Sequence, residues 1–109
     1  MAKIYATHEM ELRPGVSDEA FERYIAKDSS FFGDLPGVVI HLLKGDRGGR
    51  VGKYMVLFEF DSVETRDRYW PASGEATDEI QRRLVASEQE LWDRWAPPYP
   101  WTDYVEVTR

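Results

Sequence analysis

Hydrophobic and polar side chains alternate along residues 3–12 of the chain. The side chains of one parity are apolar except for one histidine: Ile4, Ala6, His8, Met10 and Leu12. Those of the other parity are mostly polar, which is the period of a strand with one buried face. Pro14-Gly15 ends this strand. We therefore expect His8 to point with its apolar neighbours toward the core.

The spacing of apolar residues changes to that of a helix after Ser17. Ser17 is a suitable N-cap, and the two acidic residues after it favour the positive end of a helix dipole. Aromatic and aliphatic side chains then recur every three or four residues from Phe21 to Phe32. The pattern predicts an amphipathic helix of about four turns that ends near Gly33.

Two apolar segments, 38–43 and 53–60, flank the glycine-rich stretch 45–49. Glycine supplies the positive φ angles that a hairpin turn needs, so we expect the segments to pair as antiparallel strands. In the second segment, Met55 and Leu57 alternate with a fully apolar set: Tyr54, Val56, Phe58 and Phe60. This strand is apolar on both faces.

A short helix and a longer one are predicted in the C-terminal half. Asp61 or Ser62 caps the short helix, and Pro71 stops it. The small-residue linker 72–74 is a candidate lid. After it, one apolar stripe predicts the longer helix: Ile80, Leu84, Leu91 and Trp95. The proline-rich stretch 97–100 favours an extended arm leading to a last strand over 102–107.

This βαββαβ order predicts an α+β, ferredoxin-like fold. Its four-stranded antiparallel sheet would carry the helices on one face, with the first and third strands central. The other face would then expose a large apolar patch that includes Met55, Leu57 and Tyr104. A self-complementary homodimer that buries about 800 Å² of this patch per partner is the simplest way to remove it from water.

Composition narrows the classes of partner. The 109 residues are 42% hydrophobic, which fits a single domain over 1–109. The net charge of -6 disfavours nucleic acid and anionic membranes. The chain has no cysteine, which excludes disulfides, thiolate metal sites and a cysteine nucleophile. No apolar run is long enough to span a bilayer and the start lacks a signal-peptide pattern, so we expect a cytoplasmic protein.

Three segments, 12–17, 35–38 and 55–62, together with the element order, resemble the dimeric α/β-barrel superfamily. Its relatives include antibiotic-biosynthesis monooxygenases and stress-responsive barrel proteins, and the resemblance covers about residues 3–107. It implies two sheets that form a barrel across a homodimer, and a small hydrophobic or aromatic metabolite between each sheet and its helices.

The implied chemistry is cofactor-independent monooxygenation or isomerisation. The alternative is a non-catalytic ligand-binding or interaction module, and whether the protein is an enzyme stays open. No cofactor is expected. Haem-degrading relatives use a helix-borne histidine as axial ligand, and neither predicted long helix contains a histidine.

His8 is the candidate catalytic residue, because an imidazole titrates near neutrality and can move a proton for a bound substrate. The alternative is a structural histidine bonded to a backbone carbonyl or a tyrosine hydroxyl. The direction of His41 is undetermined because its strand is apolar on both faces. The two histidines would lie about 9.6 Å apart on strands flanking a third, so no shared metal site is expected.

Aromatic residues are the candidate ligand contacts, since their flat faces can line a slot for an aromatic or polyketide-like molecule. With His41, the predicted substrate-binding set is Tyr54, Tyr69, Trp70 and Trp92. Core packing and dimer contacts are the alternative use of these rings. Four glutamates alternate on the predicted strands. If two of their carboxylates met in the barrel interior, the pKa of one of them would be raised. The alternative is that these carboxylates are solvated charges at strand ends and edges. These are Glu9, Glu11, Glu59 and Glu106.

Overall fold

A computed structural model describes residues 2–27, 35–71, 82, 86, 88–98 and 100–107. The elements follow in the order β1 (Ile4–Met10), α1 (Asp18–Lys27), β2 (Val38–Lys44), β3 (Tyr54–Phe60), α2 (Val63–Tyr69), the π-helical segment η2 (Leu91–Trp95) and β4 (Trp101–Val105). Residues 88–90 are α-helical and lead directly into η2.

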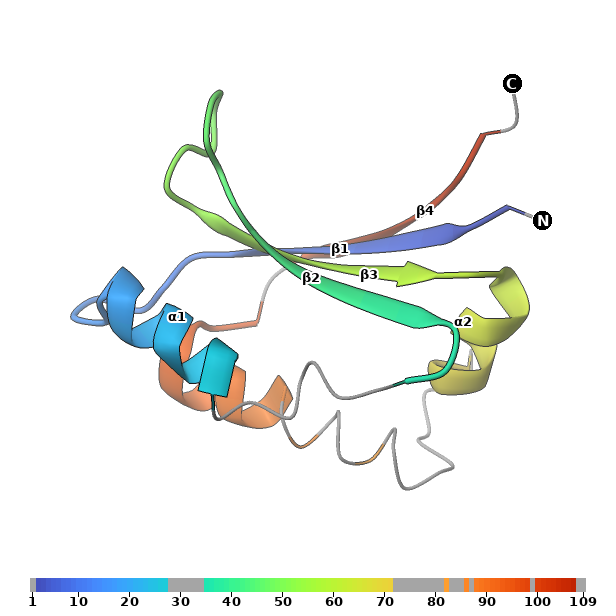
Figure 1. Ribbon diagram of the computed structural model, residues 1–109. Coiled ribbons are helices and arrows are strands. Elements are labelled where there is room, and N and C mark those ends of the chain that lie inside the picture. Colours follow the sequence, from blue (N-terminus) through green and yellow to red (C-terminus); the bar gives the residue numbers. More distant parts are fainter. Residues whose placement is uncertain are drawn as a thin grey trace.

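The four strands form one antiparallel sheet in the order β2-β3-β1-β4, so β1 and β3 are central as predicted. Figure 1 shows α1, α2 and the helical segment 88–95 on the same side of this sheet. We call that side the inner face and the opposite side the outer face. The predicted α+β architecture is confirmed.

The hydrophobic core lies between the inner face and the helices. On β1 and β3 every second side chain is buried, as the alternation predicts, except His8, which is half-buried. The buried side chains are Ile4, Ala6, Met10, Tyr54, Val56, Phe58 and Phe60. Helix α1 contributes Phe21, Tyr24 and Ile25, and the Tyr24 ring stacks on Trp95 with centroids 4.8 Å apart. The core is therefore dense at the α1 end of the sheet.

Most predicted boundaries are close to the observed ones. Helix α2 is capped by the Ser62 side chain, which accepts a hydrogen bond from the backbone N–H of Thr65. The last strand begins one residue earlier than predicted, at Trp101. The predicted end of the first helix (28–33), the linker 72–74, and Ile80 and Leu84 of the longer helix lie outside the described residues.

The turn between β2 and β3 needs glycine for two different reasons. Gly48 and Gly52 have positive φ angles of 103° and 80°. At Gly45 the constraint is space, because a Cβ there would lie 1.9 Å from the carbonyl oxygen of Arg50. The Gly45 N–H donates to the carbonyl of Lys53 at 2.8 Å, which closes the base of the turn.

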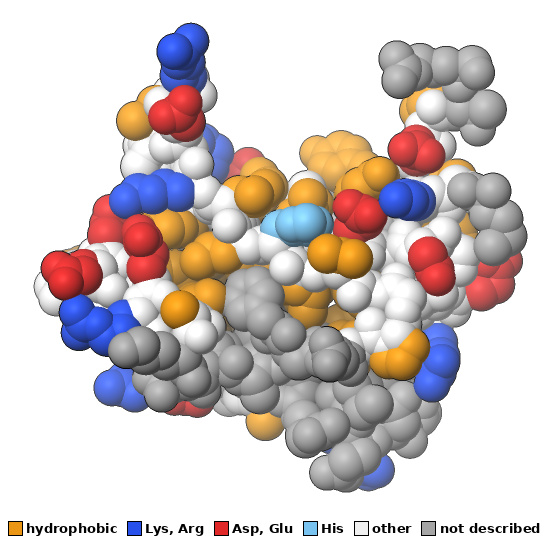
Figure 2. Space-filling model, in the orientation of Figure 1, with side chains coloured by type: hydrophobic (Ala, Val, Ile, Leu, Met, Phe, Trp, Pro, Cys, Tyr) orange, Lys and Arg blue, Asp and Glu red, His pale blue; other side chains and the backbone are white. Residues whose placement is uncertain are grey.

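The outer face is apolar and uncovered by the described residues. Val39 is 51% exposed and Tyr104 is 56% exposed, and the strand register places Leu57 between β1 and β2 on the same face. Figure 2 shows hydrophobic side chains gathered over the middle of the molecule, with charged ones toward both ends. No helix among the described residues is long and apolar enough to cross a membrane.

Candidate ligand cavity

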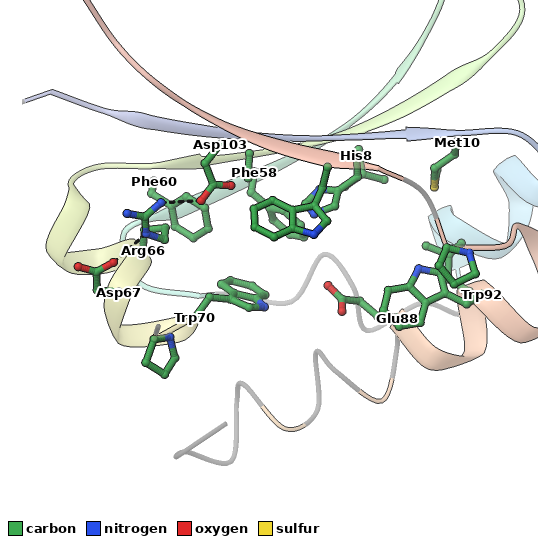
Figure 3. A pocket seen from close by; sticks show the side chains of 16 residues that line it. His8, Met10, Phe58, Phe60, Arg66, Asp67, Trp70, Glu88, Trp92 and Asp103 are labelled. Atoms are coloured by element: carbon green, nitrogen blue, oxygen red, sulfur yellow. Dashed lines mark hydrogen bonds and ion pairs between the residues drawn. The ribbon is translucent and has the colours of Figure 1, made fainter. Parts of the chain in front are cut away.

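A cavity of about 690 Å³ lies between the inner face of the sheet and the helices. The sheet supplies its roof: Ala6, His8 and Met10 from β1, Val56, Phe58 and Phe60 from β3, and Trp101 and Asp103 from β4. The helical side supplies Arg66, Asp67, Trp70, Pro71, Glu88, Leu91, Trp92 and Pro98. Figure 3 shows these side chains surrounding an open space, with most charged groups at one end.

His8 points into this cavity from the middle of β1 (Figure 3). It pairs with Val56 on one side and Trp101 on the other, and its ring meets Phe58 edge-on at 5.2 Å. Burial lowers the pKa of His8 below its usual value, although a hydrogen bond with the Val56 backbone and the Asp103 carboxylate oppose that shift. The imidazole is therefore neutral at neutral pH.

One nitrogen of this imidazole makes no hydrogen bond to a described residue. Nδ1 of His8 is buried and has no hydrogen-bond partner within the described part of the protein. A buried nitrogen without a partner is costly, so such a group favours a ligand that completes its hydrogen bonding. A neutral imidazole in this setting can orient a polar group or accept a proton.

Glu88 reaches the cavity from the opposite, helical side. Its carboxylate points into the space between Trp70 and Trp92 (Figure 3), and burial raises its pKa to about 7. Sequence reasoning missed this residue, although a signal was present. Position 88 lies four residues after Leu84 and three before Leu91, so a carboxylate occupies the otherwise apolar stripe of the predicted helix.

An ion pair forms the other end of the cavity. Arg66 of α2 donates to Asp103 of β4 at 2.5 Å and to its neighbour Asp67 at 2.8 Å. These two contacts use both carboxylates near the guanidinium. The sequence offered no signal for the pair, because 37 residues separate Arg66 from Asp103.

Two predicted ligand residues, Trp70 and Trp92, line the cavity together with His8. The Trp70 ring lies 5.5 Å from the Phe58 ring and 5.7 Å from the Phe60 ring. The core therefore does not absorb all the tryptophans, since Trp95 alone is buried in it.

Three other predicted ligand residues lie elsewhere. Tyr69 is fully buried and its hydroxyl donates to the carbonyl of Pro36 at 3.1 Å, so it joins α2 to the start of β2. Tyr54 lies at the α1 end of β3, where it bonds to Glu22 and lines a smaller hollow. Burial and that carboxylate raise the pKa of Tyr54 to about 12, so its hydroxyl stays protonated.

His41 is the third, and it lies on the outer face. It pairs with Leu57, and its Nε2 lies 3.7 Å from a Glu59 carboxylate oxygen. The sequence left its direction open because both faces of its strand are apolar. Because His41 lies on the outer face of the sheet, it does not line the cavity.

The four strand glutamates do not meet in the interior of the protein; they lie at its surface, as the alternative interpretation of the sequence predicted. Glu9, Glu11 and Glu59 each lie beside a basic side chain: Arg50 at 3.6 Å, Lys53 at 2.6 Å and Lys3 at 3.1 Å. Glu106 is exposed and accepts a hydrogen bond from Tyr5 at 3.4 Å. None of these four lines the cavity. Among the described residues, no group of three His, Asp or Glu side chains could hold a metal ion.

No protein-family profile and no curated protein matches the sequence. Solved structures do match. A DABB family protein with a ferredoxin-like fold from Mesorhizobium loti aligns with a TM-score of 0.68 and 16% identity, over 99% of this chain and 100% of its own.

Two further solved structures align nearly as completely. A dimeric protein of unknown function and ferredoxin-like fold from Bacteroides fragilis has a TM-score of 0.58 and 18% identity, with 94% of each chain covered. An ethyl tert-butyl ether d (ethd) family protein from Bacillus halodurans has a TM-score of 0.58 and 17% identity, over 98% of this chain and 99% of its own. The chain thus has the ferredoxin-like fold that the sequence predicts.

Proposed function

We propose that this protein binds a small hydrophobic or aromatic metabolite in the cavity between sheet and helices. The cavity itself carries the proposal. Its volume of about 690 Å³ lies within the range of small-molecule sites, roughly 300–1,000 Å³. Apolar and aromatic walls surround a few polar groups that converge from both sides, which is the usual composition of such a site.

The chemistry that this cavity best supports is removal of a proton from the ligand by His8. In cofactor-independent oxygenation the substrate must itself be electron-rich enough to react with dioxygen, and the protein contributes deprotonation and exclusion of water. Isomerisation needs the same proton transfer. The neutral imidazole with its unused nitrogen supports the base role.

A non-catalytic ligand-binding module is the second candidate. The packing of the His8 ring edge-on against Phe58 at 5.2 Å favours it, because a histidine held by its neighbours can have a structural role without any reaction. Both candidates require a ligand in the cavity.

Ligand binding is tested by a thermal-shift screen of aromatic and polyketide-like compounds, since a bound ligand raises the melting temperature by mass action. Hits are repeated on Ala6→Leu, which narrows the cavity, and on Thr7→Val, which changes the neighbouring side chain on the outer face. We expect the shift to shrink in Ala6→Leu and persist in Thr7→Val. An equal shift in both variants would place the ligand elsewhere.

Proton removal is tested on a hit that carries an acidic C–H group. In D₂O, wild-type protein should accelerate exchange of that hydrogen for deuterium, followed by NMR, and His8→Phe should abolish the acceleration while binding persists. Binding without accelerated exchange in the wild type would favour the non-catalytic module.

We further propose that the protein forms a homodimer through the outer face of its sheet. Val39, Leu43 and Tyr104 are 51%, 44% and 56% exposed there. The Bacteroides fragilis protein of the same fold is dimeric. A self-complementary interface would cover this apolar surface without a second kind of subunit.

A further inference from the structure

The charged groups of the cavity carry more negative than positive charge. Its described lining contains three carboxylates, Asp67, Asp103 and Glu88, against the single guanidinium of Arg66. His8 from β1 adds no positive charge at neutral pH, because its pKa is lowered. A carboxylate or phosphate ligand would therefore meet net repulsion.

Arg66 already makes ion pairs with other residues of the protein. It holds Asp103 at 2.5 Å and Asp67 at 2.8 Å, on two different nitrogens. An anionic ligand would have to replace contacts that already exist. The one guanidinium already faces two carboxylates, so it leaves none of its charge to compensate Glu88.

Among the described residues, no cation pairs with Glu88. No ion pair or hydrogen bond joins its carboxylate to another described residue, and burial alone accounts for its pKa of about 7. Figure 3 shows the carboxylate directed into open space between two tryptophans. A buried carboxylate of this kind is stabilised when a positive charge arrives.

The walls around Glu88 suit a cation as well. Trp70, Trp92 and Trp101 line the cavity, and tryptophan is the best of the aromatic rings at attracting cations. The cation–π contacts within the described residues involve Tyr54, Tyr69 and Trp95, none of which lines the cavity. None of these three tryptophans makes a cation–π contact with another described residue.

We propose that the ligand of this cavity is an aromatic or alicyclic amine whose ammonium group lies against Glu88 between Trp70 and Trp92. This inference rests on the proposed function and specifies its ligand class. The apolar roof of Val56, Phe58 and Phe60 then receives the hydrocarbon part of the ligand.

Three probes of similar shape and different charge test the inference by isothermal titration calorimetry: 2-(1-naphthyl)ethylamine, 2-(1-naphthyl)ethanol and 1-naphthylacetate. At pH 8.5 the amine should bind about tenfold more tightly than the alcohol, and the carboxylate should bind most weakly. A tenfold difference is what one desolvated charge contact of moderate strength supplies. The preference should fall at pH 5.5, where Glu88 is protonated.

Glu88→Gln should remove the tenfold preference for the amine and leave the affinity for the alcohol unchanged. Glu90→Gln is the matched control, because Glu90 lies on the same helical segment but is exposed and outside the cavity lining. The groups that face Glu88 from the other elements are His8, Asp103, Arg66 and Asp67. His8 would repel the amine if protonated, so pH dependence that persists in Glu88→Gln would assign the effect to His8 and overturn the role of Glu88.

The possible outcomes separate this inference from the function on which it rests. Equal binding of amine and alcohol to the wild type would overturn the inference and leave an aromatic ligand in place. Tightest binding by the carboxylate would also overturn it. Failure of all three probes to bind would count against the aromatic-ligand function itself.

Discussion

Arg66 Nη1 lies 2.5 Å from Asp103 Oδ2, so one ion pair joins helix α2 to the edge strand β4 (Figure 3). Both side chains are 24% exposed, which reduces screening by solvent. Among the described strands, β4 pairs with β1 alone, and the ion pair gives this edge strand a second attachment. The same contact closes one end of the cavity.

Asp103→Asn should therefore lower the free energy of unfolding by about 1–3 kcal/mol, since it weakens a charge-assisted hydrogen bond and leaves a partly buried guanidinium with less compensation. Urea denaturation measures the loss. Asp67→Asn is the control, because Asp67 is 58% exposed and exposed ion pairs contribute about 0–1 kcal/mol. Equal losses in both variants would contradict a stabilising role of the ion pair between Arg66 and Asp103.

Glu88 makes stability depend on pH in a direction opposite to that of most carboxylates. Burial raises its pKa from 4.5 to about 7, so the folded state binds more protons than the unfolded state between these values. Folded stability then falls as pH rises through this window. Glu88→Gln should lack that loss and become more stable than the wild type by on the order of 2 kcal/mol above pH 7, with the difference vanishing near pH 4.

Thermal or urea unfolding of wild type and variant from pH 4 to 8 gives this difference directly. The lowered pKa of His8 works the other way, because it costs stability as pH falls below about 6.5. Both proteins contain His8, so its contribution largely cancels in the comparison. A difference that stayed constant from pH 4 to 8 would show that the Glu88 carboxylate is solvated.

The direction of each side chain was predictable from sequence for strands with one polar face. It was less predictable for strands that are apolar on both faces. Alternation on β1 fixed the direction of His8, and the aromatic set on β3 marked its buried side. On β2 both parities are apolar, so His41 had no preferred side until pairing with Leu57 placed it on the outer face. A single strand does not contain the information that its neighbour supplies.

The cavity was harder to predict, because its polar groups come from elements far apart in sequence. Tyr69 and Trp70 are adjacent in sequence, yet Tyr69 is buried in the core and Trp70 lines the cavity. The difference arises because helix α2 ends at Tyr69. Glu88 looked like an ordinary charged helix position. Its interruption of an apolar stripe was the one local sign that it faced inward.

Gly45→Ala should destabilise the protein by about 2 kcal/mol or more, because its Cβ would lie 1.9 Å from the Arg50 carbonyl oxygen and the backbone of the turn must shift. Gly49→Ala, four residues away, is the matched control. A Cβ at Gly49 meets no atom within 4 Å, and its φ is not positive. Urea unfolding should show a loss for the first variant and almost none for the second; similar values for both would contradict this account of the turn.

Leu57→Asp tests whether the outer face is the dimer interface. Leu57 lies on the central strand β3, between His41 of β2 and Thr7 of β1, so it would be near the middle of any contact between two such sheets. A carboxylate buried there without a partner would weaken association strongly. Light scattering coupled to size-exclusion chromatography should show a dimer for the wild type at micromolar concentration and a monomer for the variant.

The control for this experiment is Val63→Asp, which places the same charge on an apolar side chain that is 38% exposed on the helical side, at the start of α2. An acidic residue is well tolerated in the first turn of a helix, so this variant should stay folded and dimeric. Circular dichroism checks that Leu57→Asp remains folded, since the outer face is not part of the core. A wild-type monomer would overturn the proposed homodimer. A dimer that survives Leu57→Asp and dissociates with Val63→Asp would place the interface on the helical side of the molecule.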